Sequence, residues 1–264
     1  MPRYFGPRIV ICEHHGDIGN MGRRTQSAKS QYEQKVQGVL HRIKSRKIGN
    51  ALLKGINVHQ PNANNCLITP TEFERPDKTM TYQLANGVQI TYNPWTWNGK
   101  DKRLGIDPTG RGYQADDVLF HELIHAFLKL IGLFRSKEGG RNDKFHNRED
   151  FYAVMFTNIY RSERNGTVAA AQRAPLRDSH ELQHKPIDPS LARSFDFYKK
   201  YSTEIESLFE VENYQPGKRA LELFVRAVRE IQCEFNPVRV RTKSGVLIDE
   251  SDNPFGGWRP KVGA

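Results

Sequence analysis

The sequence has few cysteines, and none of them stands in a recognised functional pattern. Cys12, Cys66 and Cys233 are scattered over 264 residues and are odd in number, which argues against a disulfide framework and for a reducing compartment. None has CxxC spacing, so we do not expect thiolates to bind zinc in this chain. Cysteine-protease chemistry is disfavoured as well, because no cysteine lies in a nucleophile motif.

Long apolar runs are also missing. No run approaches the roughly 20 apolar residues of a membrane span, and the short apolar run Ile9–Ile11 near the N-terminus is too short for the core of a secretory signal. The chain is 37% hydrophobic with a mean hydropathy of −0.69, so much of it must be solvated, although its length suffices for one sizeable core. We expect a protein that stays in the cytoplasm or leaves the cell by a route without a cleaved signal peptide.

The net charge of +10 is concentrated toward the N-terminus, where residues 1–54 hold eleven Lys/Arg and three Asp/Glu. Such a segment can bind nucleic acid, an anionic membrane or an acidic protein. No aromatic-basic RNA motif, zinc finger or recognition helix accompanies it. We therefore interpret it as a solvated basic surface and expect no stable nucleic-acid or membrane partner. A non-enzymatic basic nucleic-acid-binding module stays open as an alternative hypothesis.

The strongest functional signal is the run His121-Glu122-Leu123-Ile124-His125. On an α-helix, residues four apart lie on the same face, so both imidazoles can bind one zinc ion at about 2.0–2.1 Å. Glu122 lies one step round the helix, where it can act as a base toward a zinc-bound water. This is the HExxH signature of zincin metallopeptidases. It predicts one zinc ion per chain, with His121 and His125 as ligands and Glu122 as a catalytic residue.

The residues around this motif predict a buried helix. Residues 116–132 are largely apolar on all sides, and a buried helix has little reason to carry three polar side chains on one face unless they have a function. Asp116 and Asp117 come at its start, where the helix dipole favours negative charge. Gly132 is expected to end it as a C-cap.

A catalytic zinc site needs a third protein ligand, and the best candidate is Glu149. It opens residues 147–160, whose apolar spacing predicts a second helix that returns beside the first. A glutamate at the start of the next helix is the gluzincin arrangement, in which Asp150 would orient a ligand histidine. The reverse assignment, with Asp150 as the ligand and Glu149 in support, stays open. His146 is a further rival in the preceding loop.

Stabilisation of the oxyanion in the tetrahedral intermediate requires a cationic, phenolic or imidazole group. Downstream of the second helix, His180 lies in the polar run Arg177-Asp178-Ser179-His180. We predict His180 as the second catalytic residue, with a plain loop histidine as the alternative.

The remaining patterns predict an α+β fold. Residues 30–47 have an apolar stripe with helical spacing, and residues 50–56 favour a further short helix. The period changes to two over residues 81–92, where Asn86-Gly87 is a hairpin-turn signal. The side chains expected to face the core from this hairpin are Tyr82, Leu84, Val88, Ile90 and Tyr92.

In a zincin, an edge strand beside the metal helix can pair with an extended substrate, and this hairpin either supplies that edge or is purely structural. Residues 194–212 and 218–235 predict two C-terminal amphipathic helices. The predicted organisation is a basic N-terminal extension over residues 1–29, a zincin-like metallopeptidase domain over residues 30–235 and a C-terminal tail over residues 236–264. In the domain, a small sheet or hairpin would pack on the HExxH helix.

Three stretches of the sequence resemble the effector zinc metallopeptidases typified by NleD, which enteric pathogens deliver into host cells by type III secretion, and related polymorphic-toxin domains. The resemblance rests on residues 117–126 around the HExxH motif, on the acidic pair that opens residues 149–163, and on residues 87–94. Family members commonly carry two glutamates where this chain has a glutamate followed by an aspartate. The segment HELIHA, residues 121–126, is also similar to the corresponding segment of the clostridial neurotoxin light chains.

The resemblance implies a zinc-dependent endopeptidase, secreted as an effector or toxin without a cleaved signal peptide, that acts in the reducing cytosol of a target cell. Its partner would be a protein substrate, and by analogy with the family a host signalling kinase. We expect a monomer. A zinc peptidase or hydrolase with an internal or competitor-directed role is the alternative enzyme.

Overall fold

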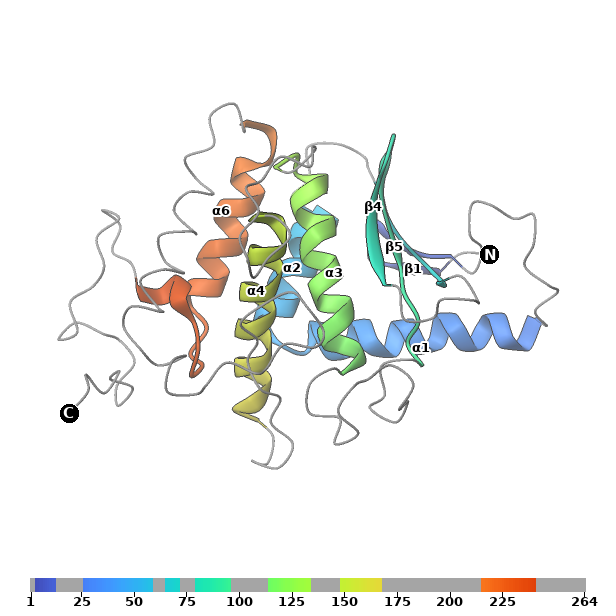
Figure 1. Ribbon diagram of the computed structural model, residues 1–264, viewed down its shortest axis with the longest axis horizontal. Coiled ribbons are helices and arrows are strands. Elements are labelled where there is room, and N and C mark those ends of the chain that lie inside the picture. Colours follow the sequence, from blue (N-terminus) through green and yellow to red (C-terminus); the bar gives the residue numbers. More distant parts are fainter. Residues whose placement is uncertain are drawn as a thin grey trace.

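The computed structural model describes residues 3–12, 26–58, 65–71, 79–95, 114–133, 148–167 and 215–240. In chain order, the elements are β1 (Arg3–Phe5), β2 (Ile9–Ile11), α1 (Gln26–Lys44), α2 (Lys47–Val58), β3 (Asn65–Thr69), β4 (Met80–Leu84), β5 (Gly87–Thr91), α3 (Ala115–Leu130), α4 (Arg148–Asn165), α6 (Gln215–Arg229) and the 3-10 helix η4 (Pro237–Val240). Helix α3 lies between the sheet and helices α2 and α4, with α6 packed on α2 (Figure 1). The α+β class predicted from the sequence is confirmed.

The five strands form one mixed sheet in the order β1-β2-β3-β5-β4. β2, β3 and β5 run parallel, and each edge strand is antiparallel to its neighbour. β2 pairs with β3 through Ile9 with Cys66 and Ile11 with Ile68. Residues that the sequence placed in an N-terminal extension are therefore part of this sheet. The sequence did not reveal these strands, because a strand of three residues is too short to give a periodic signal. The domain boundaries themselves stay a prediction.

The hairpin of β4 and β5 forms where predicted, but β4 faces the other way. Leu84 pairs with Gly87, which leaves a two-residue turn. Residues that pair directly across two strands lie on the same face of the sheet, so the odd-numbered residues of β4 share a face with the even-numbered residues of β5. Thr81 lies opposite Ile90, and Tyr82 is 44% exposed. The expectation that Tyr82 faces the core is wrong. The expected core residues after the turn are buried: Val88, Ile90 and Tyr92.

Helices α1 and α2 confirm the two helices predicted over residues 30–47 and 50–56, with α2 longer than expected. The predicted apolar stripe of α1 is buried: Tyr32, Val36, Val39, Leu40 and Ile43. At the start of α2, the backbone N–H groups of Lys47 and Ile48 donate to the carboxylate of Glu163 on α4, at 2.7 and 3.1 Å. This carboxylate satisfies two N–H groups that the helix itself leaves without partners.

Helix α3 ends at the glycine that the sequence indicated. Gly132 has φ +83°, a conformation that glycine adopts without steric cost. The N–H of Leu133 donates to Leu128 O at 2.9 Å, and that of Gly132 donates to Lys129 O at 3.0 Å. These are the two hydrogen bonds of a Schellman motif, so the predicted C-cap is confirmed.

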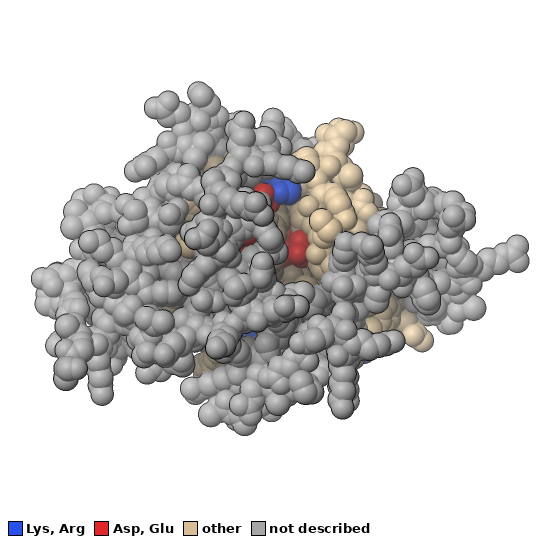
Figure 2. Space-filling view, in the orientation of Figure 1, with Lys and Arg blue, Asp and Glu red and all other residues tan. Residues whose placement is uncertain are grey.

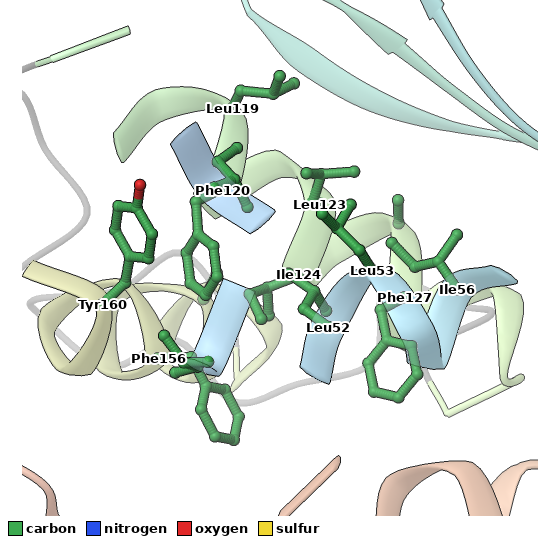
Figure 3. Packing of buried hydrophobic residues seen from close by; sticks show 14 of the residues in the cluster. Leu52, Leu53, Ile56, Leu119, Phe120, Leu123, Ile124, Phe127, Phe156 and Tyr160 are labelled. Atoms are coloured by element: carbon green, nitrogen blue, oxygen red, sulfur yellow. The ribbon is translucent and has the colours of Figure 1, made fainter. Parts of the chain in front are cut away.

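The core is built around α3, whose apolar side chains meet those of α2 and α4 (Figure 3). The residues of α3 labelled there are Leu119, Phe120, Leu123, Ile124 and Phe127, all fully buried. A Cβ added at Gly55 on α2 would lie 2.9 Å from the Phe127 ring, so this glycine permits the close packing of the two helices. Burial of each such large side chain stabilises the fold by about 1.5–3 kcal/mol.

Helix α6 confirms the helix predicted over residues 218–235, although it begins and ends earlier. It buries Leu221, Phe224 and Val228 while Glu222 and Arg226 are exposed, and the Phe224 ring packs 5.3 Å from that of Phe127. The helix predicted over residues 194–212 lies outside the described residues. Among the helices that the structure describes, none is long and apolar enough to cross a membrane.

Candidate active site

Helix α3 brings the two motif histidines together on one face. Their Nε2 atoms lie 3.1 Å apart, and their rings meet edge to face with centroids 4.8 Å apart. His125 is buried and His121 is half-buried. The four-residue spacing produces this arrangement because positions i and i+4 stack along a helix, so the two imidazole nitrogens are available to the same small ligand.

The carboxylate of Glu122 is buried beside them and is held by the edge strand. Thr81 Oγ1 on β4 donates to Glu122 Oε2 at 2.6 Å. Burial raises the pKa of Glu122, an effect that the nearby His125 and the Thr81 hydrogen bond reduce without reversing it. The sequence did not indicate Thr81, because the hairpin was assigned the opposite facing.

The first turn of α4 supplies two carboxylates next to the His125 ring. Glu149 Oε1 accepts a hydrogen bond from His125 Nδ1 at 2.7 Å, and Asp150 Oδ1 lies 3.5 Å from His125 Nε2. Both acids are buried. The structure therefore brings together the histidine pair and both acids that the sequence proposed as candidates for the third ligand.

Lys129, one turn along α3 from His125, also donates to Glu149 Oε1. Burial would raise the pKa of Glu149, but the hydrogen bonds and charges of His125 and Lys129 lower it overall. Burial would likewise lower the pKa of His125, but the hydrogen bond to Glu149 and the three nearby carboxylates raise it. Each group thus stabilises the charged form of its neighbour.

The charges of this site fit a divalent cation. With neutral imidazoles, the carboxylates of Glu122, Glu149 and Asp150 and the ammonium of Lys129 carry a formal charge of two negative. Charged side chains visible on the described surface of this face gather over α3, next to the hairpin (Figure 2). Buried charge of one sign is costly unless an opposite charge accompanies it.

The residue types at this site also fit zinc, although their side chains are not arranged around a single metal position. Among the residues that the structure describes, no group of three or more His, Cys, Asp or Glu is arranged to hold a metal ion. The two Nε2 atoms are nevertheless 3.1 Å apart, close to the separation of about 3.3 Å between two ligand atoms of a tetrahedral zinc ion. Two imidazoles with a carboxylate are a ligand set of catalytic zinc.

The far end of the same helix pair is closed by ion pairs. Asp117 Oδ2 accepts from Arg161 Nε at 3.1 Å and from Arg164 Nη2 at 3.2 Å. Asp116 Oδ2 accepts from Tyr160 Oη at 2.7 Å and from Arg164 Nη1 at 3.0 Å. The acids that the sequence assigned to the helix dipole therefore bind α3 to α4. Arg161 and Arg164 lie beyond residue 160, where the predicted second helix ended, whereas α4 continues to Asn165; the sequence therefore did not indicate this network.

Two of the predicted site residues lie outside the described residues, namely His180, predicted to stabilise the oxyanion, and His146, the rival third ligand. The roles proposed for these two histidines stay predictions. Trp95, which follows the hairpin, is 39% exposed, and its ring lies 6.0 Å from that of Tyr32.

The fold and the site define an α+β protein with an HExxH helix between a mixed sheet and a second helix that presents acids. The model of the peptidase family M91, described as effector protein, matches residues 20–173. This match spans more than half of the chain, so the protein belongs to that peptidase family of effectors, and the resemblance to the NleD-type effectors is confirmed. A search of curated proteins gave no match.

Proposed function

We propose that this effector is a zinc-dependent endopeptidase that cleaves a protein inside a target cell. The observation that carries the proposal is the paired Nε2 atoms of His121 and His125 beside the buried carboxylate of Glu122. The family supports peptidase chemistry, and the donor set and the negative charge of the site support zinc as the metal.

His121, His125 and one carboxylate from the first turn of α4 would hold the metal. The sequence favoured Glu149 for that carboxylate and left Asp150 as the alternative. Bound zinc supplies a Lewis acid and lowers the pKa of its water to about 7.

In this proposal Glu122 accepts a proton from the attacking water and returns it to the leaving amine. Two features of the structure support that role. Burial raises the pKa of Glu122, which brings a carboxylate closer to the working range of a general base. The hydroxyl of Thr81 holds Oε2 and so fixes which way the carboxylate points.

The position of β4 supports a zincin-like domain and an extended peptide as the substrate. β4 is the last strand in the order of the described sheet, runs antiparallel to β5 and reaches α3 through Thr81. An edge strand offers backbone groups with which an extended chain can pair. Met80 and Tyr82 are exposed on this strand, where they could contact substrate side chains.

The substrate and the place of action come from the family. We propose a host signalling kinase as the substrate class and delivery into the host cell without a cleaved signal peptide. His180 stays the proposed group that stabilises the oxyanion.

The test compares the wild-type protein with Glu122→Ala, each loaded with zinc and incubated with host-cell extract, and maps new protein N-termini by mass spectrometry. We expect cleavage products with wild type only, because general acid–base catalysis contributes about 10²–10⁴-fold, while both proteins keep one zinc. His121→Ala should lose both zinc and cleavage. Equal cleavage by Glu122→Ala, or a wild type that binds no zinc, would contradict the proposal.

A further inference from the structure

The two acids at the start of α4 meet different nitrogens of the same imidazole. Glu149 Oε1 lies 2.7 Å from Nδ1 of His125, and Asp150 Oδ1 lies 3.5 Å from Nε2. Consecutive helical residues project about 100° apart, so the two carboxylates cannot take the same role. Which nitrogen faces the metal therefore decides which acid is the ligand.

The partner histidine identifies the metal-facing nitrogen. His121 approaches His125 through Nε2 on both rings, at 3.1 Å, so these are the two atoms that one metal ion can share. Asp150 Oδ1, at 3.5 Å from the same Nε2 of His125, lies near the separation of about 3.3 Å expected between ligand atoms of tetrahedral zinc. Asp150 is thus the acid on the metal side of the ring.

Glu149 is engaged on the opposite side. Its Oε1 accepts hydrogen bonds from both His125 Nδ1 and Lys129 Nζ. A metal ion at that oxygen would face the ammonium group of Lys129, and two like charges at such short range repel strongly in a buried site. A carboxylate on the Nδ1–H of a histidine fixes the ring and leaves its Nε2 free to bind metal.

Resting on the zinc site of the proposed function, we infer that Asp150 is the third metal ligand and that Glu149, held by Lys129, is a positioning residue for His125. This is the reverse of the assignment that the sequence favoured, in which Glu149 is the ligand and Asp150 gives support. In this assignment, the different directions of the two side chains on α4 place Glu149 at Nδ1 of His125 and Asp150 at Nε2.

The sharpest test places a thiolate at each acid in turn and uses cobalt(II) as the probe. A cysteine that binds cobalt adds a sulfur-to-metal charge-transfer band, since thiolates are good ligands for such metals. We expect this band in Asp150→Cys, measured against the wild-type cobalt spectrum as the baseline, and no band in Glu149→Cys. A band in Glu149→Cys alone, or in neither variant although wild type binds cobalt, would overturn the inference.

Zinc affinity, measured by competition with a chelating dye, gives a second test that does not require a new ligand. Loss of an orienting carboxylate typically weakens metal binding by about 10–100-fold, so Glu149→Gln should bind zinc more weakly but still reach one per chain. Asp150→Asn should bind zinc far more weakly than Glu149→Gln. The opposite order would overturn this inference and leave the proposed function intact, whereas a wild type without zinc binding would overturn both.

Discussion

The two ends of the α3–α4 helix pair are built from similar residues but differ in charge balance. At one end, Asp116 and Asp117 meet Arg161 and Arg164, and the charges of this closed network cancel. At the other end, three carboxylates surround two imidazoles and the ammonium of Lys129, which leaves two negative charges when both imidazoles are neutral, as they are when they bind a metal. The closed end is neutral without a ligand, whereas the open end has the charge that a divalent cation would neutralise.

The largest expected effect on stability comes from breaking the closed end. Asp117→Ala leaves Arg161 and Arg164, which are buried, without one of their two acids. Loss of one partner from a buried ion pair costs about 3–5 kcal/mol, so the free energy of unfolding should fall by that amount in urea denaturation.

The matched control is Glu222→Ala, which removes an exposed acid from α6. It should change stability by no more than about 0.5 kcal/mol. If Asp117→Ala behaved like this control, the network would not be the element that joins the two helices.

The proposed zinc site predicts that the open end is stabilised by added metal. Zinc at about 100 times its dissociation constant should raise the free energy of unfolding by about 2.7 kcal/mol, as measured by urea denaturation with and without zinc. His125→Ala should lose this gain. Asp117→Ala should keep it, because the two ends share none of the contacts described above and distant sites add; loss of the zinc effect in Asp117→Ala would show that the ends are coupled.

A smaller effect is expected at the edge strand, where Thr81 holds Glu122 at 2.6 Å. Thr81→Val keeps the shape of the side chain and removes the hydroxyl. One hydrogen bond contributes about 1 kcal/mol, so kcat should fall about five- to tenfold with KM and zinc content unchanged.

Thr81→Ser restores the hydroxyl and should recover most of kcat. Equal losses in the serine and valine variants would assign the effect to packing of the hairpin rather than to the position of the Glu122 carboxylate.

The comparison also explains which parts of the molecule the sequence predicted. Local signals found both helices: a stretch that is apolar on all sides and ends in a glycine predicted α3, and helical apolar spacing predicted α4 with its acidic start. Thr81 was missed because the facing of a strand depends on turn length, and one residue reverses it. The partners of Asp116 and Asp117 lie more than 40 positions away in α4, so only the packing of the two helices reveals them. The order of Glu149 and Asp150 depends on the orientation of one imidazole ring, which no sequence pattern records.

The smallest expected effect concerns the stability of the zinc-free protein. Burial raises the pKa of Glu122 above its ordinary value of 4.5, so the stability that this group contributes is present below that value and is lost as pH rises through the higher folded pKa. Glu122→Gln should therefore be more stable than wild type at neutral pH in the presence of a chelator, and the difference should close in acid. The Thr81 hydrogen bond lowers the pKa of Glu122, so the gap should widen when both proteins carry Thr81→Val. Urea denaturation at acidic and neutral pH measures the gap, and a gap that does not vary with pH would mean that ionisation of Glu122 is not its cause.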